Sequence, residues 1–436
     1  MDYAEAYNFI TSPDNFQRQE YLKDKSEAEI YIKRLQVLLD LLGNPEDKIP
    51  HYIHVTGTSG KGSVCLMLNS ILRASGKKVG LLTSPHPSVI TERWEINGKE
   101  MSKKEFTEIV DLVKQKLAEY VKISPYGIPS PFEIFTAMGL YFFAKHKVEW
   151  VVLEVGCGGK HDSTNVIPKK DVAVITNIGL DHLHILGDTK EEIAEEKSGI
   201  IKKGCAVFTA EQDPKILKII EKESKKKKTT LIKISVNKYR DLKIDLDGTS
   251  FKYKNKNYHI PALGKHQVVN SILAINIASY LKIPDNQIRK GLAKMKAPIR
   301  MEVVSKKPLI ILDGAHNEDK MKTTIETVKN LNLADNFNVL VGFSANKDIK
   351  TMIKQLAGLK PKTIICTKYT INPFREVADP ELIASNFKKL VPKSKIKIFI
   401  NPKKALDWAK KQQNDGLLLV TGSMFLSGEL RVYFDL

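Results

Sequence analysis

Short, continuous apolar runs recur along the first half of the chain and alternate with segments of helical periodicity. The clearest runs cover residues 51–55, 79–84, 150–156, 172–179 and 205–210. Apolar runs of this length predict strands that are buried on both faces, and the segments between them predict helices that cover those faces. The alternation therefore predicts a parallel sheet with helices on both sides.

The pattern becomes polar and alternating between about residues 231 and 260, and it contains an Asp247-Gly248 pair that signals a tight turn. We predict a small antiparallel β appendage in this stretch. Two helical segments follow at about 266–281 and 285–296, and Pro298 then breaks the pattern.

The alternation of strands and helices restarts after this proline. Strands are expected in LIIL, NVLVGF, TIICT, IKIFI and LLLV. The intervening helices are expected to begin near Glu318, Lys347, Pro380 and Pro402. This order predicts a second open, doubly wound α/β domain.

The length and composition agree with two domains. At 436 residues the chain is longer than one hydrophobic core usually supports. We therefore expect an α/β protein in which residues 1–297 carry the first parallel sheet and the β appendage, and residues 298–436 form a Rossmann-like domain. With 42% hydrophobic and 27% charged residues, the chain has the composition of an ordinary globular protein.

The chain shows no signal for a membrane or for metal-binding cysteines. No apolar run approaches the roughly 20 residues that a membrane-spanning helix needs, and the first residues show no basic segment followed by an apolar stretch. We therefore expect a cytoplasmic protein without a membrane partner. The four cysteines form no CxxC pair, which argues against a zinc site or a redox motif.

The formal net charge of +19 is compatible with a nucleic acid, a membrane surface or a polyanionic substrate as partner. The lysines are scattered along every predicted helix, and the one dense run, at 222–230, lies between a helix and a strand. The chain shows no RRM, zinc-finger or helix-turn-helix signature, so we expect no nucleic-acid partner.

A glycine-rich loop lies between the predicted strand at 51–55 and a helical segment. Its residues are Gly57, Thr58, Ser59, Gly60, Lys61, Gly62 and Ser63. In this context backbone N–H groups wrap phosphates, Lys61 supplies charge near the terminal phosphates, and Ser63 offers a hydroxyl to Mg²⁺. The spacing is shorter than in GxxxxGK[ST], and a plain turn that joins strand to helix is the alternative.

Two further residues are expected at the same edge of the sheet. Glu154 ends the apolar strand WVVLEV and precedes a glycine-rich bend, and a carboxylate in this context needs a partner or a metal. We favour a Mg²⁺ ligand over a solvated loop residue. His182 follows the next strand, but its position alone does not separate a ligand from a structural histidine.

A capping box at Thr189 and Glu192 starts a helix that we expect to run to Gly204. Lys197 has apolar neighbours three and four positions away, so it lies on the apolar face of that helix. It is either a lysine whose stem covers the core or an amine whose pKa is lowered by burial. The periodicity does not separate the two.

In the second half, Asp313, Gly314, Ala315, His316 and Asn317 directly follow the strand LIIL. By itself this segment is typical of a plain strand-to-helix connection. Its position at the carboxyl end of the first strand of a domain keeps a ligand role open.

Taken together, these segments resemble the folylpolyglutamate synthase and dihydrofolate synthase family, a branch of the Mur ligases. The resemblance runs nearly end to end. In chain order it rests on HVTGTSGKGSV, LLTSPH, LEVGCGGKHDSTN, TNIGLDHLHILGDT, EEKSGII, GKHQVVNSILA, IRMEV, ILDGAHN and VTGSMFLSGELR. Several motifs in one order are far more specific than any single motif.

The resemblance implies an ATPase domain with the P-loop, a Rossmann-like second domain, and an ATP site in the cleft between them. In such enzymes ATP phosphorylates a carboxylate, and the amine of glutamate attacks the acyl phosphate. The implied partners are ATP, L-glutamate and either a folate or dihydropteroate. We also expect two Mg²⁺ ions and a monomer.

The motif matches also imply roles for single residues. Lys61, Lys197 and His182 would be catalytic. One Mg²⁺ would be held by Ser63 and Glu154, and the second by Glu154 and His182. Lys197 matches a lysine that family members convert with CO₂ to a carbamate that supports the metal site.

The remaining matches concern the two larger ligands. Nucleotide contacts beyond the glycine loop are implied for Asn270, Arg300, Asp313 and His316. Contacts that shape the folate site are implied for Ser84, Pro85, His86 and Phe132.

Several positions depart from the family pattern. Ser59 stands where asparagine or lysine is usual, Cys157 where an aliphatic residue is usual, and Ile299 where a glycine usually precedes the arginine. Residues 160–163 read KHDS where Arg-Leu-Asp-Ala is common. These departures bear on substrate preference more than on reaction type, because the phosphate and metal positions are kept.

Other functions remain open. A Mur enzyme that acts on a peptidoglycan precursor usually carries a UDP-binding domain before the P-loop, and only some fifty residues precede Gly57 here. A P-loop kinase or nucleotide switch would leave the second domain without a role. A nucleic-acid-binding ATPase would respond to DNA rather than to folate and glutamate. The sequence does not separate addition of the first glutamate to dihydropteroate from later additions to folates.

Overall fold

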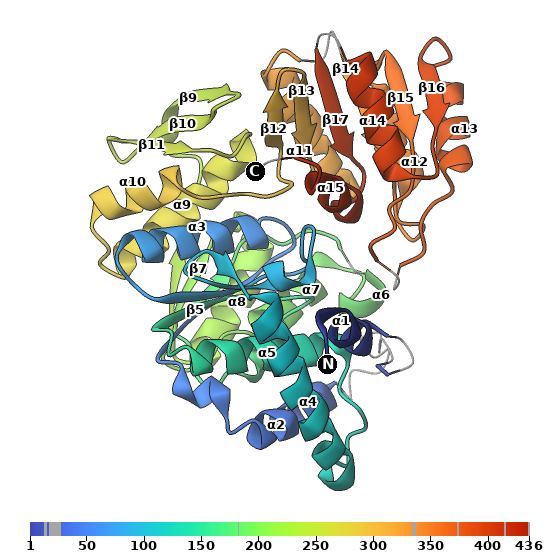
Figure 1. Cartoon of the computed structure of the whole chain (residues 1–436). Helices are drawn as coiled ribbons and strands as arrows, with labels where there is room; N and C mark the ends of the chain where they lie inside the picture. Colours follow the sequence, from blue (N-terminus) through green and yellow to red (C-terminus); the bar gives the residue numbers. More distant parts are fainter. Residues whose placement is uncertain are drawn as a thin grey trace. The chain divides into compact units, whose positions relative to one another are not determined.

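The computed structural model describes residues 1–12, 15–16, 28–181, 183–333, 337–372, 375–413 and 416–434. The chain forms two compact units (Figure 1). Unit 1 comprises Met1–Pro85, Thr91–Lys238 and Val269–Lys294, and unit 2 comprises His86–Ile90, Tyr239–Val268 and Met295–Leu436. The two units therefore interleave along the sequence.

Unit 1 is built on an eight-stranded sheet with the order β4-β3-β2-β5-β1-β6-β7-β8. Strands β2, β5, β1, β6, β7 and β8 run parallel, and β3 and β4 continue the sheet in antiparallel pairing at one edge. The strands are β1 (His51–Thr56), β2 (Val79–Leu82), β3 (Trp94–Ile96), β4 (Lys99–Glu100), β5 (Trp150–Glu154), β6 (Val172–Ile175), β7 (Ala206–Thr209) and β8 (Thr230–Lys233).

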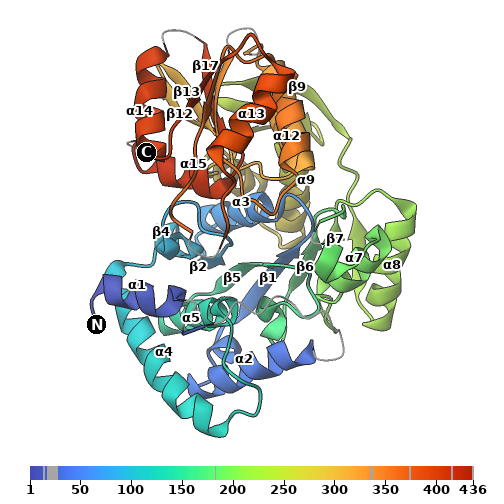
Figure 2. The ribbon, with the colours of Figure 1, turned by 90° about the vertical axis from the view of Figure 1, so that its right-hand side faces the viewer.

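Helices cover both faces of this sheet, as its uniformly buried central strands require. Helix α3 lies on one face with α10 against it, and α2, α4 and α5 lie on the other face (Figures 1 and 2). The helices are α1 (Tyr3–Thr11), α2 (Glu29–Leu41), η1 (Pro45–Lys48), α3 (Lys61–Ala74), η2 (Ile90–Arg93), α4 (Lys103–Ile123), α5 (Pro131–Lys145), η3 (Ser163–Val166), α6 (Leu183–Leu186), α7 (Lys190–Ser198), α8 (Pro214–Lys226), α9 (Lys265–Tyr280) and α10 (Asp285–Ala293).

Unit 2 contains two sheets. A three-stranded antiparallel sheet has the order β11-β10-β9, and a six-stranded sheet has the order β12-β13-β17-β14-β15-β16, parallel except for β12. The strands are β9 (Tyr239–Asp245), β10 (Gly248–Tyr253), β11 (Lys256–Ile260), β12 (Glu302–Lys306), β13 (Leu309–Leu312), β14 (Phe337–Val341), β15 (Thr363–Cys366), β16 (Lys395–Ile398) and β17 (Leu417–Thr421). The helices are α11 (Glu318–Asn330), α12 (Ile349–Ala357), α13 (Pro380–Leu390), α14 (Pro402–Gln412) and α15 (Met424–Arg431).

The predicted α/β class with two largely parallel sheets is confirmed, and the β appendage exists with its turn between β9 and β10. The prediction that the appendage begins at about residue 231 was wrong. That stretch starts with β8, which belongs to the large sheet and pairs parallel with β7 after the crossover helix α8. The helix predicted to run to Gly204 ends at Ser198, with Gly199 as its C-cap. The single domain boundary between residues 297 and 298 stays a prediction.

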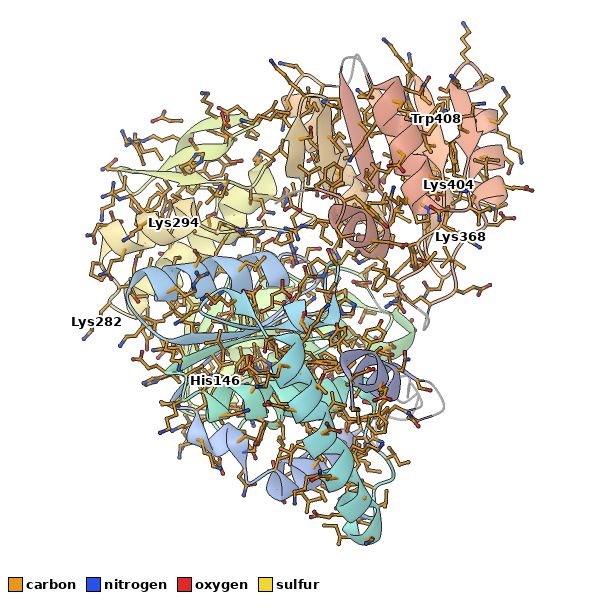
Figure 3. The ribbon with its side chains drawn as sticks, in the orientation of Figure 1. His146, Lys282, Lys294, Lys368, Lys404 and Trp408 are labelled. Carbon is orange, nitrogen blue, oxygen red and sulfur yellow. The ribbon has the colours of Figure 1, made fainter. Side chains whose placement is uncertain are left out.

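The positive charge is spread over the chain rather than gathered in one element. Figure 3 labels Lys282, Lys294 and Lys404, three exposed lysines from three separate segments. Among the helices that the structure describes, none is long and apolar enough to cross a membrane.

Candidate active site

The glycine loop connects the carboxyl end of β1 to the first turn of α3. Gly60 is the N-cap of α3 and has a left-handed φ of 85°, and Gly57 has a φ of 143°. A Cβ on Gly57 would lie 1.9 Å from Thr176 Oγ1, and a Cβ on Gly60 would lie 2.5 Å from Asn270 Oδ1. Both positions therefore require glycine, for backbone conformation and for space.

The segment after β6 holds the loop in shape. The Thr58 N–H donates to the Asn177 carbonyl oxygen at 2.9 Å, and the Ser59 N–H donates to Asn177 Oδ1 at 2.9 Å. Thr176 Oγ1 donates to the Ser59 carbonyl oxygen at 2.6 Å. Thr176 and Asn177 were not among the predicted site residues, although their place directly after a strand of the same sheet was a usable signal.

Two lysines converge on one carbonyl group of the loop. Lys61 Nζ donates to the Gly57 oxygen at 2.8 Å, and Lys197 Nζ donates to the same oxygen at 3.0 Å. Lys197 is 3% exposed, and burial, reinforced by the charge of Lys61, lowers its pKa to about 7. The prediction that Lys197 lies on the apolar face of its helix is thus confirmed, and a pKa of about 7 leaves roughly half of the amine neutral near pH 7.

Glu154 ends β5 beside β1, where it pairs in register with Val55. Its side chain is 4% exposed, and Oε2 accepts a hydrogen bond from the Ser84 N–H at 3.1 Å. Parallel register brings Glu154 and the glycine loop to the same carboxyl edge of the sheet. Nearby, burial lowers the pKa of Arg93 to about 10, and the charge of Glu154 opposes that shift.

The donor chemistry of two residues at this edge suits a magnesium ion. Ser63, in the first turn of α3, and Glu154 supply a hydroxyl and a carboxylate, and Mg²⁺ usually combines one or two such protein oxygens with waters and substrate phosphates. Outside the undescribed positions, no group of three or more His, Cys, Asp or Glu side chains could hold a metal by itself. His182, the predicted ligand of a second ion, lies outside the described residues.

A tight bend follows Glu154. The N–H groups of Gly156 and Cys157 donate to Asp162 Oδ2 at 3.1 and 3.0 Å. A Cβ on Gly156 would lie 2.6 Å from Phe132 Cε1 and Cζ, so the Phe132 ring lies directly against this glycine. Phe132 therefore lies against the bend that follows Glu154, and its contact with a folate stays a prediction.

The predicted folate loop is divided between the units. Ser84 and Pro85 fall in unit 1, where Ser84 contacts Glu154, and His86 falls in unit 2. The folate contacts of these three residues stay predictions.

The predicted nucleotide residues of the second half form a cluster in unit 2. Asp313 Oδ2 accepts the Met301 N–H at 3.0 Å, and Oδ1 accepts the Ala315 N–H at 3.1 Å and the Thr324 hydroxyl at 2.6 Å. Burial raises the pKa of Asp313, and these hydrogen bonds oppose the shift. Asp313 therefore organises the loop that carries its neighbours.

The other two residues come from two segments: Arg300 lies just before β12, and His316 lies with Asp313 on the loop that follows β13. Arg300 Nη1 donates to the Pro298 carbonyl oxygen at 3.1 Å, and His316 lies with Nδ1 2.8 Å from the Gly314 oxygen and Nε2 3.0 Å from Lys320 Nζ. Ile299 has a left-handed φ of 52°, which is unfavourable for a β-branched residue. This conformation explains why a glycine suits the position in the family pattern.

Comparison with known proteins identifies the class first. The family models for the Mur ligase middle domain and the Mur ligase glutamate ligase domain match residues 55–278 and 299–424. The chain is therefore a Mur ligase by family, and its fold agrees with that class.

Individual relatives identify the family to which the chain belongs within this class. A dihydrofolate synthase/folylpolyglutamate synthase of Bacillus subtilis is 39% identical over 338 residues, 74% of this chain and 77% of that protein. One from Buchnera aphidicola is 31% identical over 428 residues, 93% of this chain and 96% of that protein. The chain belongs to the folylpolyglutamate synthase/dihydrofolate synthase family.

Solved structures agree with this assignment. Mycobacterium tuberculosis folylpolyglutamate synthase complexed with ADP and AMPPCP matches with a TM-score of 0.82 at 27% identity, covering 93% of this chain and 95% of that one. E. coli FolC in complex with DHPP and ADP matches with a TM-score of 0.80 at 25% identity, covering 99% and 97%.

The geometry of Gly60 generates a prediction with a matched control. In Gly60→Ala the added methyl group meets Asn270, whereas Gly204, with an almost identical φ of 83°, has open space around its Cβ position. Both substitutions should lower the free energy of unfolding by about 1–2 kcal/mol through backbone strain. Gly60→Ala should in addition weaken ATP binding at least roughly tenfold, about 1.4 kcal/mol.

Thermal unfolding and ATP titration of both variants provide the measurement. Equal ATP affinity of the Gly60→Ala and Gly204→Ala proteins would contradict the assignment of this loop to the nucleotide.

Proposed function

We propose that this chain is an ATP-dependent ligase that joins L-glutamate to the carboxylate of a folate, of dihydropteroate, or of both, through an acyl phosphate. The observation that carries the proposal is the convergence of Lys61 and Lys197 on the Gly57 carbonyl, at the sheet edge that also presents Glu154. Two amines and an array of loop N–H groups suit a polyphosphate, and the family of the chain supplies the reaction class.

The reaction needs charge neutralisation and positioning rather than a protein nucleophile. A substrate carboxylate oxygen attacks the γ-phosphorus of ATP, the bond to the bridging oxygen breaks, and ADP leaves. The amine of glutamate then attacks the acyl carbon, loses a proton, and displaces phosphate. Lys61 offsets negative charge that develops on the transferred phosphoryl group, and the glycine-loop N–H groups orient the phosphates.

Ser63 and Glu154 would hold Mg²⁺, which polarises phosphate oxygens and reduces their repulsion toward an attacking carboxylate. A second ion at Glu154 and His182 is part of the same proposal. Nucleotide contacts by Asn270, Arg300, Asp313 and His316, and folate contacts by Ser84, Pro85, His86 and Phe132, are likewise proposed. So are a monomeric state and a cytoplasmic location.

Lys197 is proposed to carry a carbamate. The neutral amine attacks CO₂, a nitrogen–carbon bond forms, and one proton leaves, which turns a group that is cationic at low pH into an anion. A pKa of about 7 keeps a large neutral fraction available for this step near pH 7. The resulting anion would lie beside Lys61 and would replace electrostatic repulsion by attraction.

The proposed function is tested by product analysis. Purified protein with ATP, Mg²⁺ and glutamate should convert dihydropteroate, tetrahydrofolate or both to products heavier by one or more glutamate residues, with stoichiometric release of phosphate. Turnover that is indifferent to every pterin substrate, or that responds to DNA instead, would exclude the proposal.

We predict that Lys61→Ala lowers glutamate-dependent ATP turnover by roughly 10²–10³-fold, because a preorganised positive charge is lost at the transferred phosphate. The melting temperature should stay close to that of the wild type. Lys190→Ala, which removes an exposed lysine at the start of α7, is the control and should leave turnover unchanged. Unchanged turnover in Lys61→Ala would contradict the phosphate role.

Lys197→Ala should be inactive and should regain turnover when formate or acetate is added, because a small carboxylate can take the place of the carbamate. Lys61→Ala should not respond to these acids.

In the wild type, the ¹³C signal of a carbamate formed from labelled CO₂ should grow as the pH rises from about 6 to about 8 at fixed CO₂ pressure, because the neutral amine fraction grows. Full activity of Lys197→Ala without acid would remove this residue from the mechanism.

A further inference from the structure

A chain of buried polar side chains lies behind the candidate site, within unit 1. Its members are His54, Asp162, Thr164, Asn165 and Lys170, all at most 8% exposed. None of them is part of the proposed nucleotide, metal or folate contacts. Such a cluster is a structural core feature unless its hydrogen bonds reach groups that take part in the reaction.

Hydrogen bonds connect these side chains in two branches that start at Lys170. In the first branch, which runs through His54, Thr164 and Asp162, the number of available protons decides which group donates and which accepts. Both oxygens of Asp162 accept: Oδ2 from the Gly156 and Cys157 N–H groups, and Oδ1 from the N–H and the hydroxyl of Thr164. The single Thr164 hydroxyl proton is thereby used, so Thr164 Oγ1 must accept from His54 Nε2, 2.8 Å away. His54 is therefore the Nε2–H tautomer, and its Nδ1 is an acceptor.

Lys170 supplies the donor that this tautomer needs. Its Nζ lies 2.7 Å from His54 Nδ1 and donates to Asn165 Oδ1 at 3.0 Å. These are its two hydrogen-bond partners in the part of the chain that the structure describes. A neutral amine has two N–H groups, one for each acceptor, and burial together with the charge of Lys202 lowers the pKa of Lys170 well below its usual range.

The second branch leads from Lys170 to α7. Asn165 Oδ1 accepts from Lys170, so its Nδ2 is turned toward the carbonyl oxygens of Lys160 and Gly199, at 3.0 and 3.2 Å. Gly199 is the C-cap of α7 and lies two residues after Lys197. The first branch ends on Gly156 and Cys157, two and three residues after Glu154.

We propose that Lys170 is a positioning residue for the ligase reaction: its two N–H groups direct one hydrogen-bond branch to the bend that follows Glu154 and another to the end of the helix that carries Lys197. The inference rests on the roles proposed for these two residues. Loss of either branch frees one of the two elements that bound the metal and phosphate region. Hydrogen-bond partners behind metal ligands typically contribute 10–100-fold to metal affinity or activity.

The test compares Lys170→Met, Lys170→Gln and the control Lys202→Met in the full-length protein. Methionine keeps length and burial but removes both donors, whereas glutamine restores a neutral group with two N–H bonds. Lys202 is a neighbouring lysine whose amine, among the described residues, donates only to the backbone oxygens of Asn165 and Ile167. Its replacement removes a charge near Lys170 but leaves the side-chain hydrogen bonds of both branches in place. Two readouts are used: the Mg²⁺ dependence of ADP binding, and the ¹⁵N spectrum of His54.

In Lys170→Met the Mg²⁺ concentration for half-maximal ADP binding should rise roughly 10–100-fold. The His54 Nδ1 resonance should move to the position of an acceptor without a hydrogen bond, while Nε2 stays protonated. Lys170→Gln should recover at least part of both properties, and Lys202→Met should change neither, whatever its effect on stability. Where Lys170→Met does not fold, Thr164→Val breaks the first branch with the amine in place and should give the same loss of Mg²⁺ response.

A wild-type Mg²⁺ response in a folded Lys170→Met protein, with or without a lower melting temperature, would overturn the inference and leave Lys170 a core residue. Both readouts work without folate or glutamate. A wild-type protein that binds Mg²⁺ and ADP but ligates nothing would therefore count against the proposed function and not against the role of Lys170.

Discussion

The candidate site depends on one carbonyl oxygen. Gly57 directly follows β1, and its carbonyl oxygen accepts hydrogen bonds from two amines, Lys61 of α3 and Lys197 of α7. The charge of Lys61 and the burial of Lys197 both disfavour a second positive charge at this point, which is why the pKa of Lys197 is lowered. The site therefore favours whatever brings negative charge, and a nucleotide polyphosphate and a carbamate both do so.

The sheet makes this convergence possible. Strands β5, β1 and β6 are parallel neighbours, so the residues that follow each of them meet at one edge. The bend after β5 is held by Asp162, the glycine loop after β1 is held by Asn177, and the lysines come from the helices that follow. No single segment contains the site, and its precision comes from hydrogen bonds between loops that are far apart in sequence.

Much of this arrangement could be predicted from the sequence because its signals are local. Apolar runs predicted the central strands, the glycine loop predicted the start of α3, and the helical spacing around Lys197 predicted its place on the apolar face of its helix. What could not be predicted depends on pairing between distant residues. The short strand β8 is TLIK, and two apolar residues were too few to separate it from the alternating pattern that follows. Only its parallel pairing with β7 places it in the large sheet.

The same reason explains the site residues that sequence analysis missed. Thr176 opens a motif and directly follows a strand, but its contact with Gly57 is visible only in three dimensions. Lys170 has unremarkable sequence neighbours, and its role arises from a histidine more than a hundred positions away. His182 could be predicted from its motif, but it lies outside the described residues. The left-handed backbone at Ile299 could not be inferred from an isoleucine, since that side chain disfavours it.

The interleaving of the two units has a consequence for dissecting the protein. The chain passes from one unit to the other after Pro85, Ile90, Lys238, Val268 and Lys294. Leu246 and Leu263, from the region of the three-stranded sheet, are packed with Phe337 and Leu417 in one core of unit 2. A fragment that stops at residue 297 would carry these leucines without the residues of unit 2 that cover them.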